Sequence, residues 1–176
     1  MSKFWYMNVL LLFTGGTISM VRDAETGALH PADIQTFKTY VPELFAGDIH
    51  VDMIPFEPLL DSSDLNPDNW RQMAQTVQQH YDAYDGFVIL HGTDTMAYSA
   101  SALSFMFDNL CKPVVFTGSQ LPVGVLRSDA KENLLTAIEI AAAYDADGKA
   151  LVPEVTVYMD GELYRGNRTT KRNAEH

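Results

Sequence analysis

The chain has 176 residues, 47% of them hydrophobic and 20% charged, which is the composition of one folded domain and excludes an intrinsically disordered chain. Lys and Arg number 12 against 23 Asp and Glu, and a net charge of −11 repels polyphosphate, so we expect no nucleic-acid partner. No apolar run approaches the roughly 20 residues of a membrane helix, and the single cysteine, Cys111, is typical of a reducing compartment, which together predict a cytoplasmic protein without membrane contact.

Two apolar stretches in the first third of the chain predict strands. Phe4 to Phe13 is an almost unbroken apolar run that ends near a glycine pair, as expected of a central parallel strand covered on both faces. Ile49 to Phe56 predicts a second strand, interrupted late by Pro55. Residues 18 to 31, between the two, are expected to form a loop.

Asn66 and Pro67 predict the start of a helix, because an asparagine side chain caps a first turn and proline suits the first helical position. The apolar residues predicted to share one face of this helix are Trp70, Met73, Ala74, Val77, Tyr81 and Tyr84.

The second half of the chain alternates between short apolar runs and helical patterns. Strands are predicted at Gly86 to Leu90, Pro113 to Phe116 and Val155 to Met159. The two intervening helices are marked by apolar faces, one with Met96, Ala100, Leu103 and Phe107, the other with Leu134, Ala137, Ile138 and Ala141.

This alternation predicts the α/β class, with parallel strands joined by right-handed crossovers in a three-layer, doubly wound, mainly parallel sheet of flavodoxin- or Rossmann-like type. Ligands of such sheets bind beyond the carboxyl ends of the strands, where the strand order reverses. Two polar segments fall at such ends, Thr14-Gly15-Gly16-Thr17 after the first strand and Gly92-Thr93-Asp94-Thr95 after the third. If those strands are neighbours, both loops open into one crevice.

The glycine pair allows backbone angles closed to other residues, so Gly15 and Gly16 can aim amide N–H groups at an anion and lift a following hydroxyl into the crevice. A phosphate cradle or a plain turn would explain the same pair. Neither G-x-G-x-x-G nor G-x-x-x-x-G-K-[ST] occurs, so the usual nucleotide signatures are missing.

Several short segments with a distinctive polar composition are spread over most of the chain. They are Thr14-Gly15-Gly16-Thr17-Ile18, Asp61-Ser62-Ser63-Asp64, His91-Gly92-Thr93-Asp94-Thr95-Met96, Thr117-Gly118-Ser119-Gln120, Arg127-Ser128-Asp129 and Leu163-Tyr164-Arg165-Gly166-Asn167-Arg168-Thr169-Thr170-Lys171. Their order is that of bacterial cytoplasmic L-asparaginases, so the chain resembles the asparaginase/glutaminase family over essentially its whole length.

The resemblance implies hydrolysis of L-asparagine to L-aspartate and ammonia, without a cofactor or metal, through a covalent acyl-enzyme. Thr17 is the implied nucleophile, although spacing alone does not distinguish it from Thr14. Thr93, Asp94 and Lys171 are the implied polar triad that activates the threonine or the attacking water, which suits a hydroxyl that is a weak nucleophile near neutral pH.

The resemblance also assigns substrate-binding residues. Asp94 is expected to hold the substrate's α-ammonium, and Ser62, Ser63 and the backbone near Gly92 its α-carboxylate. Local structure alone would account for the same residues, since Ser62 and Ser63 suit a turn before the next helix, Asp94 suits a helix cap, and Lys171 suits a solvated side chain. Four basic residues are expected on a solvated hairpin and tail, namely Arg165, Arg168, Lys171 and Arg172.

Two features depart from the family. Its members carry a tyrosine on the mobile loop after the nucleophile, whereas no tyrosine lies between Ile18 and Pro31 here, and His30 is a weak substitute. Residues 1–176 correspond to the amino-terminal domain, and the family's carboxyl-terminal domain is absent from the chain; the full-length protein is expected to be a homo-oligomer, a dimer or tetramer. The alternatives are a truncated, non-catalytic amino-acid-binding or assembly module, and the amidotransferase subunit that supplies ammonia for tRNA-linked amidation.

Overall fold

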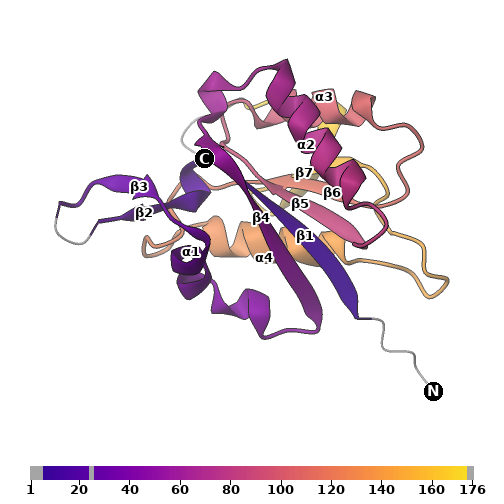
Figure 1. Cartoon of the computed structure of the whole chain (residues 1–176), viewed down its shortest axis with the longest axis horizontal. Helices are drawn as coiled ribbons and strands as arrows, with labels where there is room; N and C mark the ends of the chain where they lie inside the picture. The colour runs from indigo at the N-terminus through magenta and orange to yellow at the C-terminus, as the bar shows by residue number, and fades with distance from the viewer. Residues whose placement is uncertain (1–5, 24–25, 174–176) are drawn as a thin grey trace.

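The computed structural model describes residues 6–23 and 26–173. A six-stranded sheet in the order β4-β1-β5-β6-β7-β8 forms the centre, and only β8, at one edge, runs antiparallel to its neighbour. Helices cover both faces of this sheet (Figure 1), which confirms the predicted α/β sandwich. Its strands are β1 (Met7–Gly15), β4 (Ile49–Leu60), β5 (Gly86–Leu90), β6 (Val114–Thr117), β7 (Val155–Met159) and β8 (Glu162–Arg165).

The first strand divides the core into two layers because its side chains alternate between the faces of the sheet. Leu10 and Leu12 pack under α2 (Pro67–Gln79) and α3 (Met96–Met106). Leu11 and Phe13 pack on the opposite side, with α1 (Ile34–Tyr40) and α4 (Ala130–Ala141). β1 is therefore buried on both faces, which explains its apolar run and confirms the predicted central strand.

The edge strand β4 is longer than predicted. It continues through Pro55, which pairs with Phe13, and ends at Leu60. Proline has no backbone N–H to donate to a neighbouring strand, and it is tolerated in an edge strand because such a strand has a hydrogen-bonded neighbour on one side only. The predicted interruption at Pro55 is therefore wrong.

The segment from residue 18 to 31 is not the predicted loop throughout. A short 3₁₀ turn, η1 (Thr17–Ser19), leads into a small separate hairpin of β2 (Met20–Arg22) and β3 (Leu29–Pro31). Figure 1 shows this hairpin projecting from the main sheet. Strands of three residues are too short to produce a hydrophobic period, which is why the sequence pattern does not reveal them.

The stretch before β4 contains two further elements that the sequence pattern does not reveal, α1 and the 3₁₀ turn η2 (Pro42–Phe45). The first begins at the side chain of Asp33, which accepts a hydrogen bond from the Thr36 amide at 2.7 Å. Its one buried residue, Phe37, meets the ring of Phe13 edge-on at 5.0 Å between centroids. One buried side chain in seven residues does not establish a helical period.

The helix α2 begins as predicted and ends early. The Asn66 side chain accepts from the Asp68 amide at 2.9 Å, and Pro67 is the first helical residue. Because the helix ends at Gln79, Tyr81 and Tyr84 do not lie on its face, although both pack against the same core. Phe107 likewise lies just past the end of α3.

β1 lies between β4 and β5 in the sheet, so later strands are added on both of its sides. The chain leaves β1 towards one edge and returns on its other side as β5, so the strand order reverses here. The predicted neighbourhood of the first and third strands is confirmed, because Phe13 pairs with Leu90. The described residues contain no helix long and apolar enough to cross a membrane.

Candidate active site

A crevice of about 350 Å³ opens beyond the carboxyl ends of β1, β4 and β5. This is the place where a doubly wound sheet binds its ligands. All of the predicted site residues except Lys171 line it, namely Thr17, Ser62, Ser63, Gly92, Thr93 and Asp94. The structure thus brings Thr17 and Thr93, which are far apart in sequence, to one crevice.

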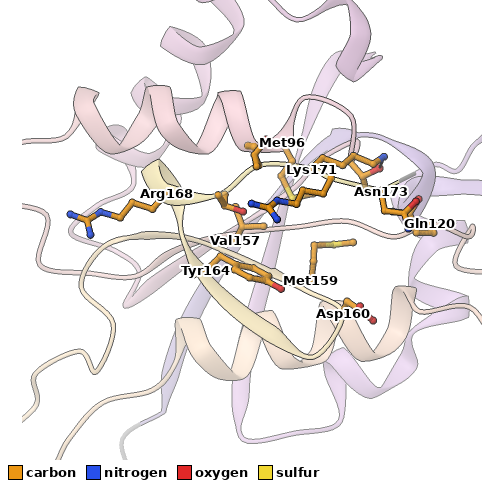
Figure 2. A pocket seen from close by; sticks show the side chains of 14 residues that line it. Met96, Gln120, Val157, Met159, Asp160, Tyr164, Arg168, Lys171 and Asn173 are labelled. Carbon is orange, nitrogen blue, oxygen red and sulfur yellow. Dashed lines mark hydrogen bonds between the residues drawn. The ribbon is translucent and has the colours of Figure 1, made fainter. Parts of the chain in front are cut away.

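A second cavity of about 430 Å³ is also lined by Thr93, which it shares with the crevice. Its wall is largely apolar, with Met96, Met159 and Tyr164 among the residues seen in Figure 2, and Lys171 projects along it. Sequence patterns do not reveal this cavity, because α3, β7 and the segment after β8, which are far apart in sequence, come together to line it. Lys171 therefore lines this second cavity and bonds to Thr93, the residue that it shares with the crevice.

The backbone of the crevice is shaped by close approach at the glycine pair. Gly15 and Gly16 have φ angles of 132° and 85°, which side-chain-bearing residues rarely adopt. A Cβ atom on Gly16 would lie 2.5 Å from the Gly92 nitrogen, and one on Gly15 would lie 2.3 Å from the Leu60 oxygen. Glycine at these positions lets the three loops touch and leaves Thr17 at the crevice wall.

The environments of the two threonines in this turn differ. Thr14 is 2% exposed, and its hydroxyl donates to the Leu90 carbonyl at 2.5 Å, a bond that ties β1 to β5. Thr17 lines the crevice, and its hydroxyl has no hydrogen-bond partner among the described residues. The two hydroxyls therefore differ in their surroundings, one bonded in the core and the other at the crevice.

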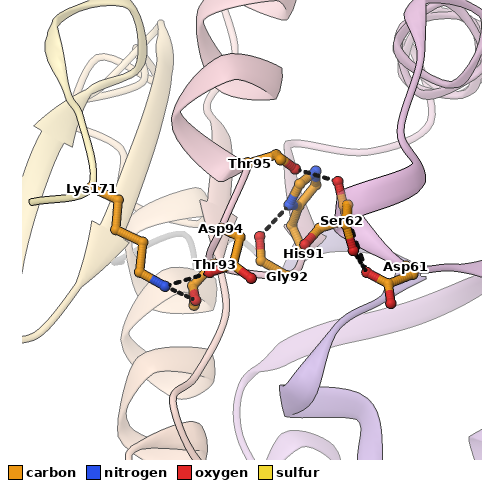
Figure 3. A network of polar contacts seen from close by, with 9 residues as sticks. Asp61, Ser62, His91, Gly92, Thr93, Asp94, Thr95 and Lys171 are labelled. Carbon is orange, nitrogen blue, oxygen red and sulfur yellow. Dashed lines mark hydrogen bonds and ion pairs between the residues drawn. The ribbon is translucent and has the colours of Figure 1, made fainter. Parts of the chain in front are cut away.

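Lys171 bonds to two neighbouring residues of the crevice wall, Thr93 and Asp94 (Figure 3). Its ammonium donates to the Thr93 hydroxyl at 2.8 Å and to the Asp94 carboxylate at 2.7 Å. The lysine side chain is 23% exposed and that of Asp94 75% exposed. Lys171 is therefore bonded to crevice residues rather than free in solvent, and it contacts both Thr93 and Asp94.

Asp94 does not cap the following helix. α3 begins at Met96, its cap position is Thr95, and no side chain bonds to the first-turn amides. The Thr95 hydroxyl instead donates to the Ser62 carbonyl at 2.7 Å, which fixes the Asp61–Asp64 turn against the Thr93 loop. The carboxylate of Asp94 is thereby left for Lys171 and for the crevice.

The two serines of the crevice differ in what their hydroxyls contact. The Ser63 hydroxyl and amide both donate to the Asp61 carboxylate, at 2.5 and 2.9 Å, and these bonds hold the pKa of Asp61 below its usual range. The turn interpretation is thus correct for Ser63. Ser62 is 7% exposed, its Oγ has no hydrogen-bond partner in the described part of the chain, and it faces Gly92, where an added Cβ would lie 2.3 Å from it.

A third loop is fixed behind the crevice by the carboxylate of Asp129. It accepts from the amides of Gln120 and Leu121 at 2.9 and 3.1 Å, and from the Asn133 side chain at 3.1 Å. The Arg127–Asp129 segment of the sequence pattern therefore shapes the loop after β6. Gln120 lines the second cavity rather than the crevice.

The β2–β3 hairpin contributes Met20 and Pro31 to the crevice rim. Ala28 lies in its turn, and its carbonyl accepts from the Asp23 amide at 2.8 Å. His30 is exposed and does not line the crevice, so it is no replacement for the tyrosine in this arrangement.

The site offers hydroxyls, the carboxylates of Asp61 and Asp94, and the Lys171 ammonium, which suit nucleophilic and acid–base chemistry. In the described part of the chain, no group of three or more His, Cys, Asp or Glu side chains is arranged to hold a metal ion.

Comparison with known proteins bears on what these residues do. Residues 8–176 match the sequence model of the family described as Asparaginase, N-terminal. The chain belongs to the asparaginase family. It is 47% identical over 169 residues to L-asparaginase 1 of Escherichia coli K12, covering 96% of this chain and 48% of that protein.

Solved asparaginase structures share the fold. The L-asparaginase I of Vibrio cholerae superposes with a TM-score of 0.85 at 43% identity, over 96% of this chain and 49% of that one. The thermostable L-asparaginase of Thermococcus kodakarensis gives 0.84 at 34% identity, over 97% and 49%. The chain thus spans about half the length of the asparaginases it matches.

Proposed function

We propose that this chain carries the catalytic residues of an amidohydrolase that converts L-asparagine to L-aspartate and ammonia, with Thr17 as nucleophile. The observation that carries the proposal is the hydrogen bond from Lys171 to Thr93 in the wall of the crevice that Thr17 lines without a hydrogen-bond partner of its own. Family membership supports the reaction, because relatives that are similar to the chain are named L-asparaginases.

The proposed reaction has two steps. In the first, Thr17 Oγ1 bonds to the side-chain carboxamide carbon, the carbon–nitrogen bond breaks, and the hydroxyl proton leaves with ammonia. In the second, water attacks the β-aspartyl ester, releases L-aspartate and returns the proton to Thr17. The Thr93–Lys171 pair assists proton transfer, and general acid–base help of this kind is worth roughly 10²–10⁴ in rate.

The charge that develops on the carboxamide oxygen needs donors. The proposed donors are backbone N–H groups near Thr17 and Thr93, which lie on the two loops that meet at the Gly16–Gly92 contact. The amide of Thr93 donates to no acceptor within the ranges 6–23 and 26–173, so it is available to a ligand.

Substrate binding is assigned to the remaining crevice residues. Asp94 is proposed to hold the α-ammonium with the part of its carboxylate that faces solvent. The hydroxyl of Ser62, the Ser63 segment and the backbone near Gly92 are proposed to hold the α-carboxylate. Because the Ser63 hydroxyl already donates to Asp61, Ser62 is the stronger hydroxyl donor of the pair.

The organisation of the whole protein is also a proposal. Residues 1–176 correspond to the amino-terminal asparaginase domain, and the matched share of the relatives agrees with a further carboxyl-terminal domain in the full-length enzyme. A homo-oligomer that completes the site, and a cytoplasmic location suggested by the single cysteine, belong to the same proposal.

The test is ammonia release from L-asparagine by the purified chain and by Thr17→Ala. The substitution is expected to reduce kcat at least about 10³-fold, because the attacking atom is lost. Thr76→Ala is the matched control, since Thr76 is half-buried on α2, does not line the crevice, and its hydroxyl donates to the Gln72 carbonyl of the same helix. Retained activity in Thr17→Ala contradicts the nucleophile assignment.

A silent wild-type chain contradicts the hydrolase proposal and favours the alternative, a non-catalytic amino-acid-binding module. The observation that favours this alternative is the absence of a tyrosine between Ile18 and Pro31. Calorimetric binding of L-asparagine without turnover would then identify it.

A further inference from the structure

A series of hydrogen bonds links α2 to the loop after β5, which lines the crevice. The Trp70 indole nitrogen lies 2.9 Å from the Ser99 hydroxyl, which lies 2.9 Å from His91 Nε2. The other ring nitrogen of the histidine, Nδ1, lies 2.7 Å from the Gly92 carbonyl oxygen (Figure 3). None of these side chains lines the crevice, but Gly92 does.

The groups at the two ends of this hydrogen-bond series, the Trp70 indole and the Gly92 carbonyl, fix which atom donates in each bond. An indole N–H can only donate, so Ser99 Oγ accepts from Trp70, and its own proton is left for His91 Nε2. A carbonyl oxygen can only accept, so His91 Nδ1 carries the ring proton and donates to Gly92. Ser99 and Trp70 therefore select one tautomer of a neutral imidazole.

The surroundings of the ring favour this neutral form. His91 is 1% exposed and Ser99 is fully buried, and the ring meets Phe116 edge-on at 5.7 Å. Burial lowers the pKa of His91 to about 4, so the ring is uncharged near neutral pH. Removal of Ser99 would leave Nε2 without its donor in an apolar layer.

The bond to Gly92 has a consequence for the next amide. In a trans peptide the carbonyl and the following N–H point in opposite directions. With the Gly92 carbonyl held towards His91, the Thr93 N–H points to the other side of the loop, and Thr93 lines the crevice.

We propose that His91 is a positioning residue, held by Ser99 and Trp70, that orients the Gly92–Thr93 peptide so that the Thr93 N–H faces the substrate. The same bond holds the backbone from which Thr93 reaches Lys171. This inference rests on the proposed function, in which that N–H stabilises charge on the carboxamide oxygen.

Variants of the wild-type chain separate orientation from packing. His91→Leu removes the donor to Gly92, whereas His91→Asn keeps a side-chain amide in reach of that carbonyl. Ser99→Ala removes the link to Trp70 at a residue outside the crevice. Ser104→Ala is its matched control on the same helix, because Ser104 donates only to the Ser101 carbonyl at 2.7 Å.

For His91→Leu we expect kcat to fall about tenfold or more and KM to change little. The reason is that a misdirected Thr93 N–H no longer stabilises the charge on the carboxamide oxygen, which develops mainly in the transition state. Ser99→Ala should show a smaller fall of the same kind, His91→Asn should recover most of the activity, and Ser104→Ala should match the wild type. Equal losses in His91→Leu and His91→Asn, or an unchanged kcat in His91→Leu, overturn the proposal.

A second readout does not depend on activity. The nitrogen-15 chemical shifts of the His91 ring should show a protonated Nδ1 and a bare Nε2 from pH 8 to pH 5. The amide signal of Thr93 should shift in His91→Leu and Ser99→Ala but not in Ser104→Ala. A proton on Nε2 in the neutral ring, or an unchanged Thr93 amide signal in the variants, overturns the positioning role of His91 even if asparagine is hydrolysed. A silent wild-type chain with these expected signals contradicts the proposed function alone.

Discussion

The two loops that meet in the crevice are built in different ways. The loop after β1 is shaped by backbone contact, because Gly15 and Gly16 take positive φ angles and touch the neighbouring loops. The loop after β5 is shaped by side chains, with Lys171 bound to its hydroxyl and carboxylate and His91 to its backbone. The first loop is therefore sensitive to added atoms, and the second to lost hydrogen bonds.

The largest effect is expected in the backbone-shaped loop. Gly16→Ala would place a Cβ 2.5 Å from the Gly92 nitrogen at a φ of 85°, so the two loops must separate. We expect a loss of about 3 kcal/mol or more in the free energy of unfolding, measured by urea denaturation, together with loss of activity.

Gly148→Ala is the control for this substitution. Gly148 has a similar φ of 76°, but nothing lies within 4 Å of an added Cβ. It should cost about 1 kcal/mol, the strain of the backbone angle alone. Equal losses in the two variants would show that close approach plays no part at Gly16.

In the side-chain-shaped loop, Lys171→Met should separate activity from stability. We expect kcat for ammonia release to fall about 10³-fold, since general acid–base help is lost. The free energy of unfolding should change by less than about 1 kcal/mol, because Asp94, its ion-pair partner, is largely exposed.

Lys131→Met is the matched control, since Lys131 also forms an ion pair, with Glu43 at 3.1 Å, but lies away from the crevice. It should leave kcat unchanged. Full activity in Lys171→Met would contradict the role given to the Thr93–Lys171 contact.

The smallest effect concerns His91 and pH. The folded-state pKa of about 4 lies below the ordinary value of 6.5, so the unfolded chain takes up the proton first as pH falls. His91 therefore stabilises less and less from pH 6.5 down towards pH 4, with about 2 kcal/mol lost between pH 7 and pH 5. In urea denaturation, the free energy of unfolding of His91→Asn should fall by about 2 kcal/mol less between pH 7 and pH 5 than that of the wild type. The other four histidines are present in both proteins, so they do not contribute to this difference. Identical pH dependence would mean that His91 titrates normally.

Much of the frame could be predicted from the sequence, because long buried elements leave a clear pattern. The apolar run of β1, the cap at Asn66 and the alternation after residue 86 are such cases. The β2–β3 hairpin and α1 could not be predicted, since three to seven residues with one buried side chain carry no period. The continuation of β4 through Pro55 depends on its place at the sheet edge, which only the assembled sheet defines.

The site shows the same division. The glycine pair and the polar loop after β5 are visible as strand-end signals, and the structure brings them together. Lys171 could be singled out only through the family resemblance, because its contact with Thr93 joins residues 78 positions apart. The Ser99 link to His91 has no sequence signature, since a serine in the middle of an apolar helix is an ordinary residue there.

The most direct test of the central claim is to find which hydroxyl is acylated. The chain is mixed with L-asparagine, quenched in acid during turnover, and its peptides are mapped by mass spectrometry. We expect a mass increase of one aspartyl group on the peptide that contains Thr17, and we expect it to be absent in Thr17→Ala. An aspartyl group on Thr93 instead, or ammonia release with no acylated threonine, would contradict it.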